Sequence, residues 1–254
     1  MFYLVGIGLQ AEHISLEAQK TVKKCRKVFL DSYTNYFPSQ QIKETEKLLK
    51  KKVTVLNRRQ IEEGFTETLE EARKKNIAVL VPGNPLTATT HVQLLIEAKK
   101  LGVPFCFVPG ISITDFLGWT GLDAYRFGRI TTIVAPKENF SPESFFDVIQ
   151  KNISANCHTL CLLEFDAEKN FALDIPTAIR LLESIGEKRG TPIIKDSVLV
   201  GMYGIAGKKQ KIVSGKAGEL KGIRSSVFPQ SLVVCSELNE KEKEAIGALA
   251  GNGA

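Results

Sequence analysis

Short apolar runs alternate with helical stretches over the first 110 residues of the chain. The predicted strands are 2–8, 27–31, 51–56, 77–83 and 104–110. The predicted helices are a first one on which Ile14, Ala18, Val22 and Cys25 share a face, followed by 61–75 and 88–101. Alternation of this kind is typical of a parallel sheet with helices on both faces, which binds ligands at the carboxyl ends of its strands.

The pattern changes after residue 111. Strands are expected at 129–135, 157–165, 197–205 and 231–236, and helices near 143–152, 175–189 and 239–250. The segment 207–215 predicts a turn that returns to a short antiparallel strand. We therefore predict an α/β fold of two α/β domains, 1–111 with a parallel sheet and 112–254 with a mixed sheet, with a ligand cleft between them.

Composition and the N-terminal sequence argue against membrane and secreted proteins. Of the 254 residues, 43% are hydrophobic and 24% charged, enough apolar material for a closed core. No apolar run reaches the roughly 20 residues of a membrane helix, and the N-terminus has no basic region before its first strand. We expect a cytoplasmic protein.

Cysteine and histidine spacing gives no sign of a metal site. The five cysteines are scattered and lie mostly in apolar runs, which predicts buried free thiols in a reducing compartment. His13, His91 and His158 are too far apart for a local zinc motif. We interpret His158, within a predicted strand, as a core or cleft-edge histidine, and we expect no metal.

The formal charge of +6 is concentrated in one stretch. Residues 207–224 carry six basic side chains and one acidic one, a local excess of +5. A solvated surface is the favoured interpretation, and a basic patch for an acidic partner is the alternative. Phe228 is the only aromatic side chain nearby, so we expect no direct nucleic-acid binding.

Three strands end in turns that could hold a ligand. VGIGL at 5–9 lacks the third glycine of a dinucleotide fingerprint, because Ala11 stands there, and Ser15 is expected to cap the following helix. For this turn, structural and ligand-binding interpretations stay open. VPGNPLTATTH at 81–91 and VPGIS at 108–112 each end a strand in Pro-Gly before a helix. We expect Thr87, Thr89 or Thr90 to cap one helix and Ser112 the next, and the two turns to end adjacent strands and converge on one rim.

No catalytic side chain stands out. The sequence has no GxSxG elbow, P-loop or HExxH motif. Tyr125 and Arg126 are compatible with either a functional role or a link between domains. The absence of these motifs favours a reaction that needs neither a protein nucleophile nor a metal.

Several segments together resemble the diphthine synthases, S-adenosylmethionine-dependent methyltransferases of the tetrapyrrole-methylase-like class. They are YLVGIGL, PGNPLTATTH, the pair Ser112–Ile113, TGLDAYRFG, PESFFDVIQKN and HTLCLLEF. The resemblance implies that S-adenosylmethionine, and its product S-adenosylhomocysteine, bind between the two domains. By matching positions, the implied contacts are Leu9, Asn84, Thr87, Ser112, Ile113, Leu163, Ile205 and Gln230.

The chain departs from the family pattern at three places. Asn84 stands where the family has aspartate, and an amide still accepts a hydrogen bond but lacks the charge. Gln230 and Asn239 replace histidines, and Tyr203-Gly204 replaces Ala-Arg. A family member with weakened activity is therefore one alternative.

The resemblance also implies a substrate and an assembly. The substrate would be elongation factor 2, in which a histidine carries a 3-amino-3-carboxypropyl group whose amino group is methylated repeatedly, three times in archaea with a fourth methyl added in eukaryotes. A homodimer is implied as well. The alternatives are a methyltransferase of the same fold acting on a tetrapyrrole such as a precorrin or uroporphyrinogen, and a non-enzymatic RNA-binding module.

Overall fold

The computed structural model describes residues 1–249, and these divide into two compact units at Ile113 and Thr114. The predicted domain boundary, between residues 111 and 112, lies two residues before this division. Residue 250, the last of the predicted helix 239–250, lies outside the described residues. No helix among residues 1–249 combines the length and hydropathy that crossing a membrane requires.

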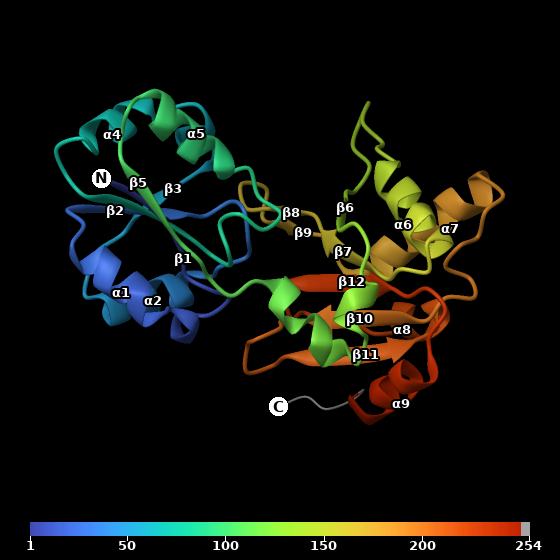
Figure 1. Ribbon diagram of the computed structural model, residues 1–254. Coiled ribbons are helices and arrows are strands. Elements are labelled where there is room, and N and C mark those ends of the chain that lie inside the picture. Colours follow the sequence, from blue (N-terminus) through green and yellow to red (C-terminus); the bar gives the residue numbers. More distant parts are fainter. Residues whose placement is uncertain (250–254) are drawn as a thin grey trace. The chain divides into compact units, whose positions relative to one another are not determined.

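The first unit is built on an all-parallel sheet of five strands in the order β3-β2-β4-β1-β5 (Figure 1). Its strands are β1 (Phe2–Gly6), β2 (Lys27–Asp31), β3 (Thr54–Leu56), β4 (Ile77–Val81) and β5 (Phe105–Val108). Strand β4 is buried along its whole length, as the unbroken apolar sequence IAVLV predicts for the middle of a parallel sheet. The predicted parallel sheet is confirmed.

Helices cover both faces of this sheet (Figure 1). They are α1 (Leu16–Lys23) and α2 (Ser39–Leu49) on one face, and α3 (Arg58–Glu62), α4 (Thr66–Glu71) and α5 (Val92–Lys100) on the other. Alternate residues of β4 enter two separate apolar clusters, Val79 packing with α4 and α5 and Leu80 with α1 and α2. The Ser15 hydroxyl accepts a hydrogen bond from Ala18 N (3.0 Å), which confirms its role as the N-cap of α1.

The second unit holds a separate mixed sheet in the order β11-β10-β12-β7-β6. Its strands are β6 (Thr131–Ile133), β7 (Thr159–Leu163), β10 (Leu199–Tyr203), β11 (Lys211–Gly215) and β12 (Gln230–Val234). Strand β6 runs parallel to β7, whereas β10 pairs antiparallel with both β11 and β12. The antiparallel return at 207–215 and the mixed sheet are therefore confirmed.

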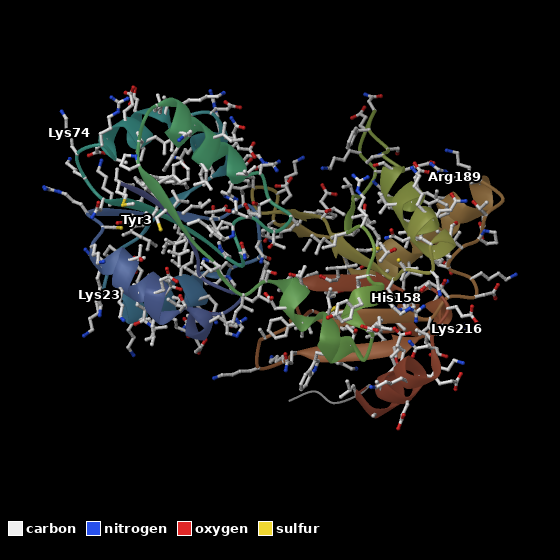
Figure 2. All side chains as sticks on the ribbon, viewed as in Figure 1. Tyr3, Lys23, Lys74, His158, Arg189 and Lys216 are labelled. Carbon is white, nitrogen blue, oxygen red and sulfur yellow. The ribbon has the colours of Figure 1, made fainter. Side chains whose placement is uncertain are left out.

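Helices α6 (Ser144–Ser154), α7 (Ile175–Lys188) and α8 (Ala217–Lys221) pack on this second sheet in one apolar cluster. Helix α7 begins at a cap of its own, since the Asp174 carboxylate accepts from Thr177 N (2.8 Å). A short hairpin of β8 (Phe165–Asp166) and β9 (Phe171–Ala172) precedes α7, and α9 (Glu240–Leu249) follows β12. In Figure 2, His158 lies within this unit, whereas Arg189 points outward.

Candidate functional site

Glycines bring three strand-ending turns of the first unit into backbone contact. A Cβ atom on Gly6, at the end of β1, would lie 2.4 Å from Gly110 N and 2.9 Å from Gly83 O. A Cβ atom on Gly110 would lie 2.3 Å from Gly83 O. Real side chains do not approach backbone so closely, so these turns can meet only because Gly6 and Gly110 lack a side chain.

The turns after β4 and β5 do converge, but their strands are not neighbours. Each of the two strands pairs with β1, which runs between them. The expectation of adjacent strands is therefore wrong. The convergence occurs because Gly6 in the intervening strand leaves room for the flanking turns.

The first and second turns are also joined by a pair of backbone hydrogen bonds. Gly83 N donates to Gly8 O (2.8 Å), and Gly8 N donates to Gly83 O (3.3 Å). Both glycines have positive φ values, 74° and 86°, which residues with a Cβ adopt only at a cost. The Leu9 side chain lies over Gly83, with Cδ2 3.9 Å from the position of a Cβ atom there.

Asn84 shapes the second turn with its side chain. Its Oδ1 accepts a hydrogen bond from Leu86 N (3.0 Å), and its carbonyl oxygen accepts from Thr87 N (3.1 Å). This is an Asx turn, which aspartate and asparagine form equally well through the same acceptor atom. The replacement of the family aspartate by Asn84 therefore preserves the shape of the turn and removes its charge.

The segment from Pro82 to His91 is longer and less regular than the sequence predicts. Helix α5 begins at Val92 rather than near 88, because Ala88 has a left-handed backbone (φ 54°). His91 occupies the N-cap position without a side-chain cap, so none of the three expected threonines caps the helix. Thr89 Oγ1 instead accepts from His91 N (3.2 Å) and donates to the Pro85 carbonyl.

The third turn leads from β5 to buried Ser112 and half-buried Ile113. A 3₁₀ helix (Ile113–Thr120) starts here, where an ordinary helix was expected. The predicted residues of the first unit, namely Leu9, Asn84, Thr87, Ser112 and Ile113, thus all lie on the turns at the carboxyl edge of the sheet.

The predicted residues of the second unit also share one sheet edge. Leu163 ends β7, Gln230 begins β12, and Ile205 follows β10. In the strand register, Gln230 lies opposite Tyr203, and its neighbour Ser231 lies opposite Leu162. Leu163 is half-buried and Ile205 is buried.

The Gln230 side chain makes three hydrogen bonds within its own unit. Its Oε1 accepts from Ile175 N (2.9 Å) at the start of α7, and its Nε2 donates to the carbonyls of Ser225 (3.3 Å) and Val227 (3.1 Å). The residue is only 4% exposed. Its amide therefore ties α7 to the segment that leads into β12.

A buried aspartate and histidine lie beside the first group, where the sequence analysis assigned no role. Asp31 ends β2, His91 ends the 82–91 segment, and both side chains are fully buried. His91 Nε2 lies 3.2 Å from Asp31 Oδ2, without the alignment of a hydrogen bond. The sequence does contain a signal for this pair, namely that each residue follows a strand. Residues that follow neighbouring parallel strands lie at the same edge of the sheet.

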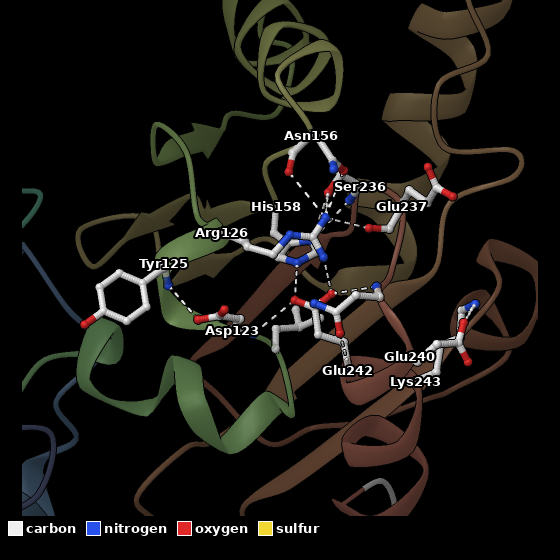
Figure 3. A network of polar contacts seen from close by, with 12 residues as sticks. Asp123, Tyr125, Arg126, Asn156, His158, Ser236, Glu237, Glu240, Glu242 and Lys243 are labelled. Carbon is white, nitrogen blue, oxygen red and sulfur yellow. Dashed lines mark hydrogen bonds and ion pairs between the residues drawn. The ribbon is translucent and has the colours of Figure 1, made fainter.

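A second polar network lies at the opposite edge of the second sheet (Figure 3). Buried Glu242 of α9 accepts from His158 Nε2 (2.9 Å), Asp123 N (3.1 Å) and Asn239 N (3.0 Å), and it also pairs with Arg126. His158 is fully buried and hydrogen-bonded, which supports the first of its two interpretations, a core histidine, and Arg126 has a structural role here.

Burial and the hydrogen bond from Ser236 N favour the neutral form of His158. Its Nδ1 accepts from Ser236 N (3.2 Å), so the ring carries its proton on Nε2, which donates to Glu242. Burial lowers the pKa of His158, although hydrogen bonding and attraction to Glu242 oppose this. Burial alone would raise the pKa of Glu242, but the donors around it hold that pKa below its ordinary value.

Within residues 1–249, no three histidine, cysteine, aspartate or glutamate side chains gather in a way that could hold a metal ion. The five cysteines are free, and Cys25, Cys161 and Cys235 are buried. Burial raises the pKa of the Cys25 thiol to about 11, which makes it unreactive.

Comparison with known proteins places the chain in a family. The family model described as "Tetrapyrrole (Corrin/Porphyrin) Methylases" matches residues 1–221. A diphthine synthase of Methanococcus vannielii is 34% identical over 254 residues, covering 99% of this chain and 100% of the relative. A diphthine synthase of Staphylothermus marinus is 34% identical over 255 residues, covering 99% and 94%.

Solved structures agree with the sequence relatives. A crystal structure of a diphthine synthase matches with a TM-score of 0.87 and 28% identity, covering 98% of this chain and 95% of the other. On both the sequence and the structural comparison, the chain belongs to the tetrapyrrole methylase family and, within it, to the diphthine synthases.

Proposed function

We propose that the chain is an S-adenosylmethionine-dependent methyltransferase of diphthamide biosynthesis. Its substrate is the 3-amino-3-carboxypropyl-histidine of elongation factor 2, whose amino group it methylates repeatedly. The observation that carries this proposal is similarity to diphthine synthases over 99% of the chain. The glycine-dependent meeting of three turns at one sheet edge supports it.

The predicted residues at the two sheet edges have the apolar and polar side chains that the cofactor requires. The backbone of the three turns meets at Gly6, Gly83 and Gly110, and the Leu9 side chain lies over Gly83. Leu9 and Ile113 would offer apolar surface to the cofactor, while Asn84, Thr87 and Ser112 would offer polar groups. In the second unit, Leu163 and Ile205 would add apolar contacts.

Gln230 would serve this site indirectly. Its Oε1 and Nε2 atoms are already engaged with Ile175, Ser225 and Val227. We infer that Gln230 holds the segment before β12 in place instead of touching the cofactor with its side chain. An amide suits this role, since it offers an acceptor and two donors at once.

Bound S-adenosylmethionine supplies a methyl group that its sulfonium charge activates, so an unprotonated amine can accept it without a covalent enzyme intermediate. The chain then has to bind and orient the two reactants, and orientation alone can lower a barrier by roughly 7–11 kcal/mol. We therefore nominate no catalytic side chain.

Calorimetric titration with S-adenosylmethionine and S-adenosylhomocysteine tests the cofactor assignment. We expect micromolar dissociation constants at about one site per chain. Absence of binding at high ligand concentration would contradict the proposal, and it would favour a family member disabled by its changes at Asn84 and Gln230.

The second candidate acceptor is a tetrapyrrole, which the description of the matching family model favours. Transfer of a labelled methyl group to uroporphyrinogen, compared with transfer to modified elongation factor 2, separates the two. Label on the tetrapyrrole alone would assign the chain to the alternative reaction.

We also propose a cytoplasmic homodimer that does not bind nucleic acid directly. Sedimentation equilibrium tests the dimer, and a monomer mass at micromolar concentration would contradict it. A salt-dependent RNA-binding assay tests the remaining alternative, because binding through phosphate contacts weakens steeply as salt rises.

A further inference from the structure

We propose that Asp31 and His91 are positioning residues that hold the 82–91 segment in its cofactor-binding conformation. This inference rests on the proposed function, because Asn84 and Thr87 of that segment are among the implied cofactor contacts. The two residues do not touch the cofactor themselves, since both side chains are fully buried.

The 82–91 segment needs anchoring at both ends. It has no regular secondary structure, and its backbone includes the left-handed residue Ala88. At its start, Gly83 is held by the two backbone hydrogen bonds to Gly8. At its end, His91 is the residue whose side chain enters the interior and faces another element, at Asp31.

Asp31 is itself rigidly placed. Its Oδ1 accepts hydrogen bonds from Tyr33 N (2.8 Å) and Thr34 N (3.2 Å), an Asx turn that fixes the carboxylate at the end of β2. Its second oxygen, Oδ2, is left facing His91 Nε2 at 3.2 Å. A buried carboxylate is costly without a polar partner, so this contact strongly favours one position of the His91 ring.

A second set of contacts joins the same two segments. The Tyr33 and His91 rings are neighbours, with centroids 6.1 Å apart and planes tilted by 33°. Glu62 Oε1 accepts from both the Tyr33 hydroxyl (3.4 Å) and the Thr90 hydroxyl (3.3 Å). Segment 31–34 and the end of segment 82–91 are thus joined by contacts from adjacent residues on each side.

Asp31→Asn is the variant that isolates the contact. Asparagine keeps the acceptor for the Asx turn and nearly the same volume, but it removes the charge that faces His91. The 82–91 segment should then sample more conformations before the ligand binds. Affinity falls when the binding-competent conformation is less populated or has to be ordered on binding.

Glu242→Gln is the matched control. Glu242 also pairs with a fully buried histidine, His158, at 2.9 Å. It lies at the sheet edge opposite to Leu163, Ile205 and Gln230, and in the other unit from segment 82–91. The control also loses a carboxylate that pairs with a buried histidine. It therefore shows how much general destabilisation alone changes ligand affinity.

The experiment is calorimetric titration of the wild type and both variants with S-adenosylhomocysteine. We expect Asp31→Asn to raise the dissociation constant about tenfold, equivalent to about 1.4 kcal/mol, with unchanged stoichiometry. Glu242→Gln should keep the wild-type dissociation constant within about twofold. A merely structural role of Asp31 would lower the number of competent sites without changing the dissociation constant, and that result would overturn the inference.

Failure of the proposed function gives a different result, because the wild type itself would then not bind S-adenosylhomocysteine. Should Asp31→Asn not fold, His91→Gln is measured in the same way. It keeps a hydrogen-bond donor but not the ring that packs against Tyr33, so we expect weakened binding with unchanged stoichiometry. Wild-type affinity in a folded variant of either residue would refute the positioning role.

Discussion

Backbone contact between glycines determines how closely the three turns of the first unit approach one another. At Gly6, the constraint is the backbone of two other turns rather than the local conformation. At Gly8 and Gly83, the positive φ is what favours glycine. The absence of a Cβ atom at these positions therefore determines the shape of the turns in the proposed cofactor site.

Gly6→Ala should disturb both stability and binding. The added methyl group would collide with Gly110 and Gly83 backbone atoms, which cannot rotate away. We expect the free energy of unfolding to fall by about 1–3 kcal/mol, as for other overpacked sites, together with weaker S-adenosylhomocysteine binding. Urea denaturation and calorimetry measure the two effects.

Gly218→Ala is the control for that variant, because nothing lies within 4 Å of a Cβ atom at this position in α8. It should leave binding unchanged and preserve or slightly raise stability. Equal behaviour of the two alanine variants would contradict the role assigned to Gly6.

Asn84 offers a test of shape against charge. Asn84→Asp keeps the acceptor for Leu86 N, whereas Asn84→Ala removes it and loses about 0.5–1.5 kcal/mol from the turn. We expect the alanine variant to bind S-adenosylhomocysteine more weakly than the wild type, and the aspartate variant to bind at least as well as the alanine variant. The reverse order in calorimetry would mean that the Asx turn is not what the site needs.

At the scale of elements, apolar pattern predicted the strands well and the helices unevenly. The strands of both sheets were recognisable because each buries a compact apolar run such as IAVLV. Helix α2 (Ser39–Leu49) was missed because its apolar residues are few and Thr45 supplies part of its buried face. The predicted helix 61–75 is interrupted near Gly64, so it forms the separate helices α3 and α4.

The part of the candidate site that lies on turns after strands was predictable. Turn residues after strands are visible in the sequence, and in a parallel sheet they gather at one edge. The positions of Asp31 and His91 after strands are visible in the sequence, but their pairing also requires that β2 and β4 are neighbours, which the sequence does not show. The three bonds of the Gln230 amide likewise depend on the placement of α7 against β12.

The network that joins α9 to β7 should make stability depend on pH. The pKa of His158 lies below its ordinary value of 6.5 in the folded protein, so the unfolded chain binds more protons as the pH falls through that value. Stability should therefore decrease on acidification from about pH 7.5 to about pH 5.5. The pKa of Glu242, lowered from 4.5, adds a further loss only at lower pH.

Urea denaturation of the wild type and of His158→Gln at several pH values measures this contribution. The pKa of His13 is also lowered by burial, so His158→Gln retains part of the slope from this second histidine. The variant should show a smaller decrease than the wild type. Identical slopes would mean that His158 does not contribute.

The hairpin between β10 and β11 carries three exposed lysines of the basic stretch. Lys216 donates to the Asp196 carbonyl (2.6 Å), and Lys221 pairs with Glu183 (2.7 Å), whereas Lys208, Lys209 and Lys211 are exposed. Reversal of these three lysines to glutamate should slow association with elongation factor 2, most strongly at low salt.

Reversal of the exposed Lys20, Lys23 and Lys24 is the control, since it changes the net charge by the same amount on the first unit. Figure 2 shows Lys23 pointing outward there. The rates of association, by stopped flow, or of methylation are measured at low salt for both variants and the wild type. Equal rates for the hairpin variant and the wild type would rule out docking through the hairpin.

At the scale of the whole molecule, the chain consists of two units of different construction. The first ends an all-parallel sheet in converging turns, and the second contains a mixed sheet. Family membership over nearly the full length accounts for both halves together. The central claim is that they act on the modified histidine of elongation factor 2.

Intact-protein mass spectrometry of elongation factor 2 tests that claim most directly. The factor carrying the 3-amino-3-carboxypropyl group is incubated with the chain and S-adenosylmethionine, and factor without that group serves as the control. We predict a stepwise gain of methyl groups on the modified factor alone. An unchanged mass of the modified factor, with a chain that binds S-adenosylmethionine, would contradict the account.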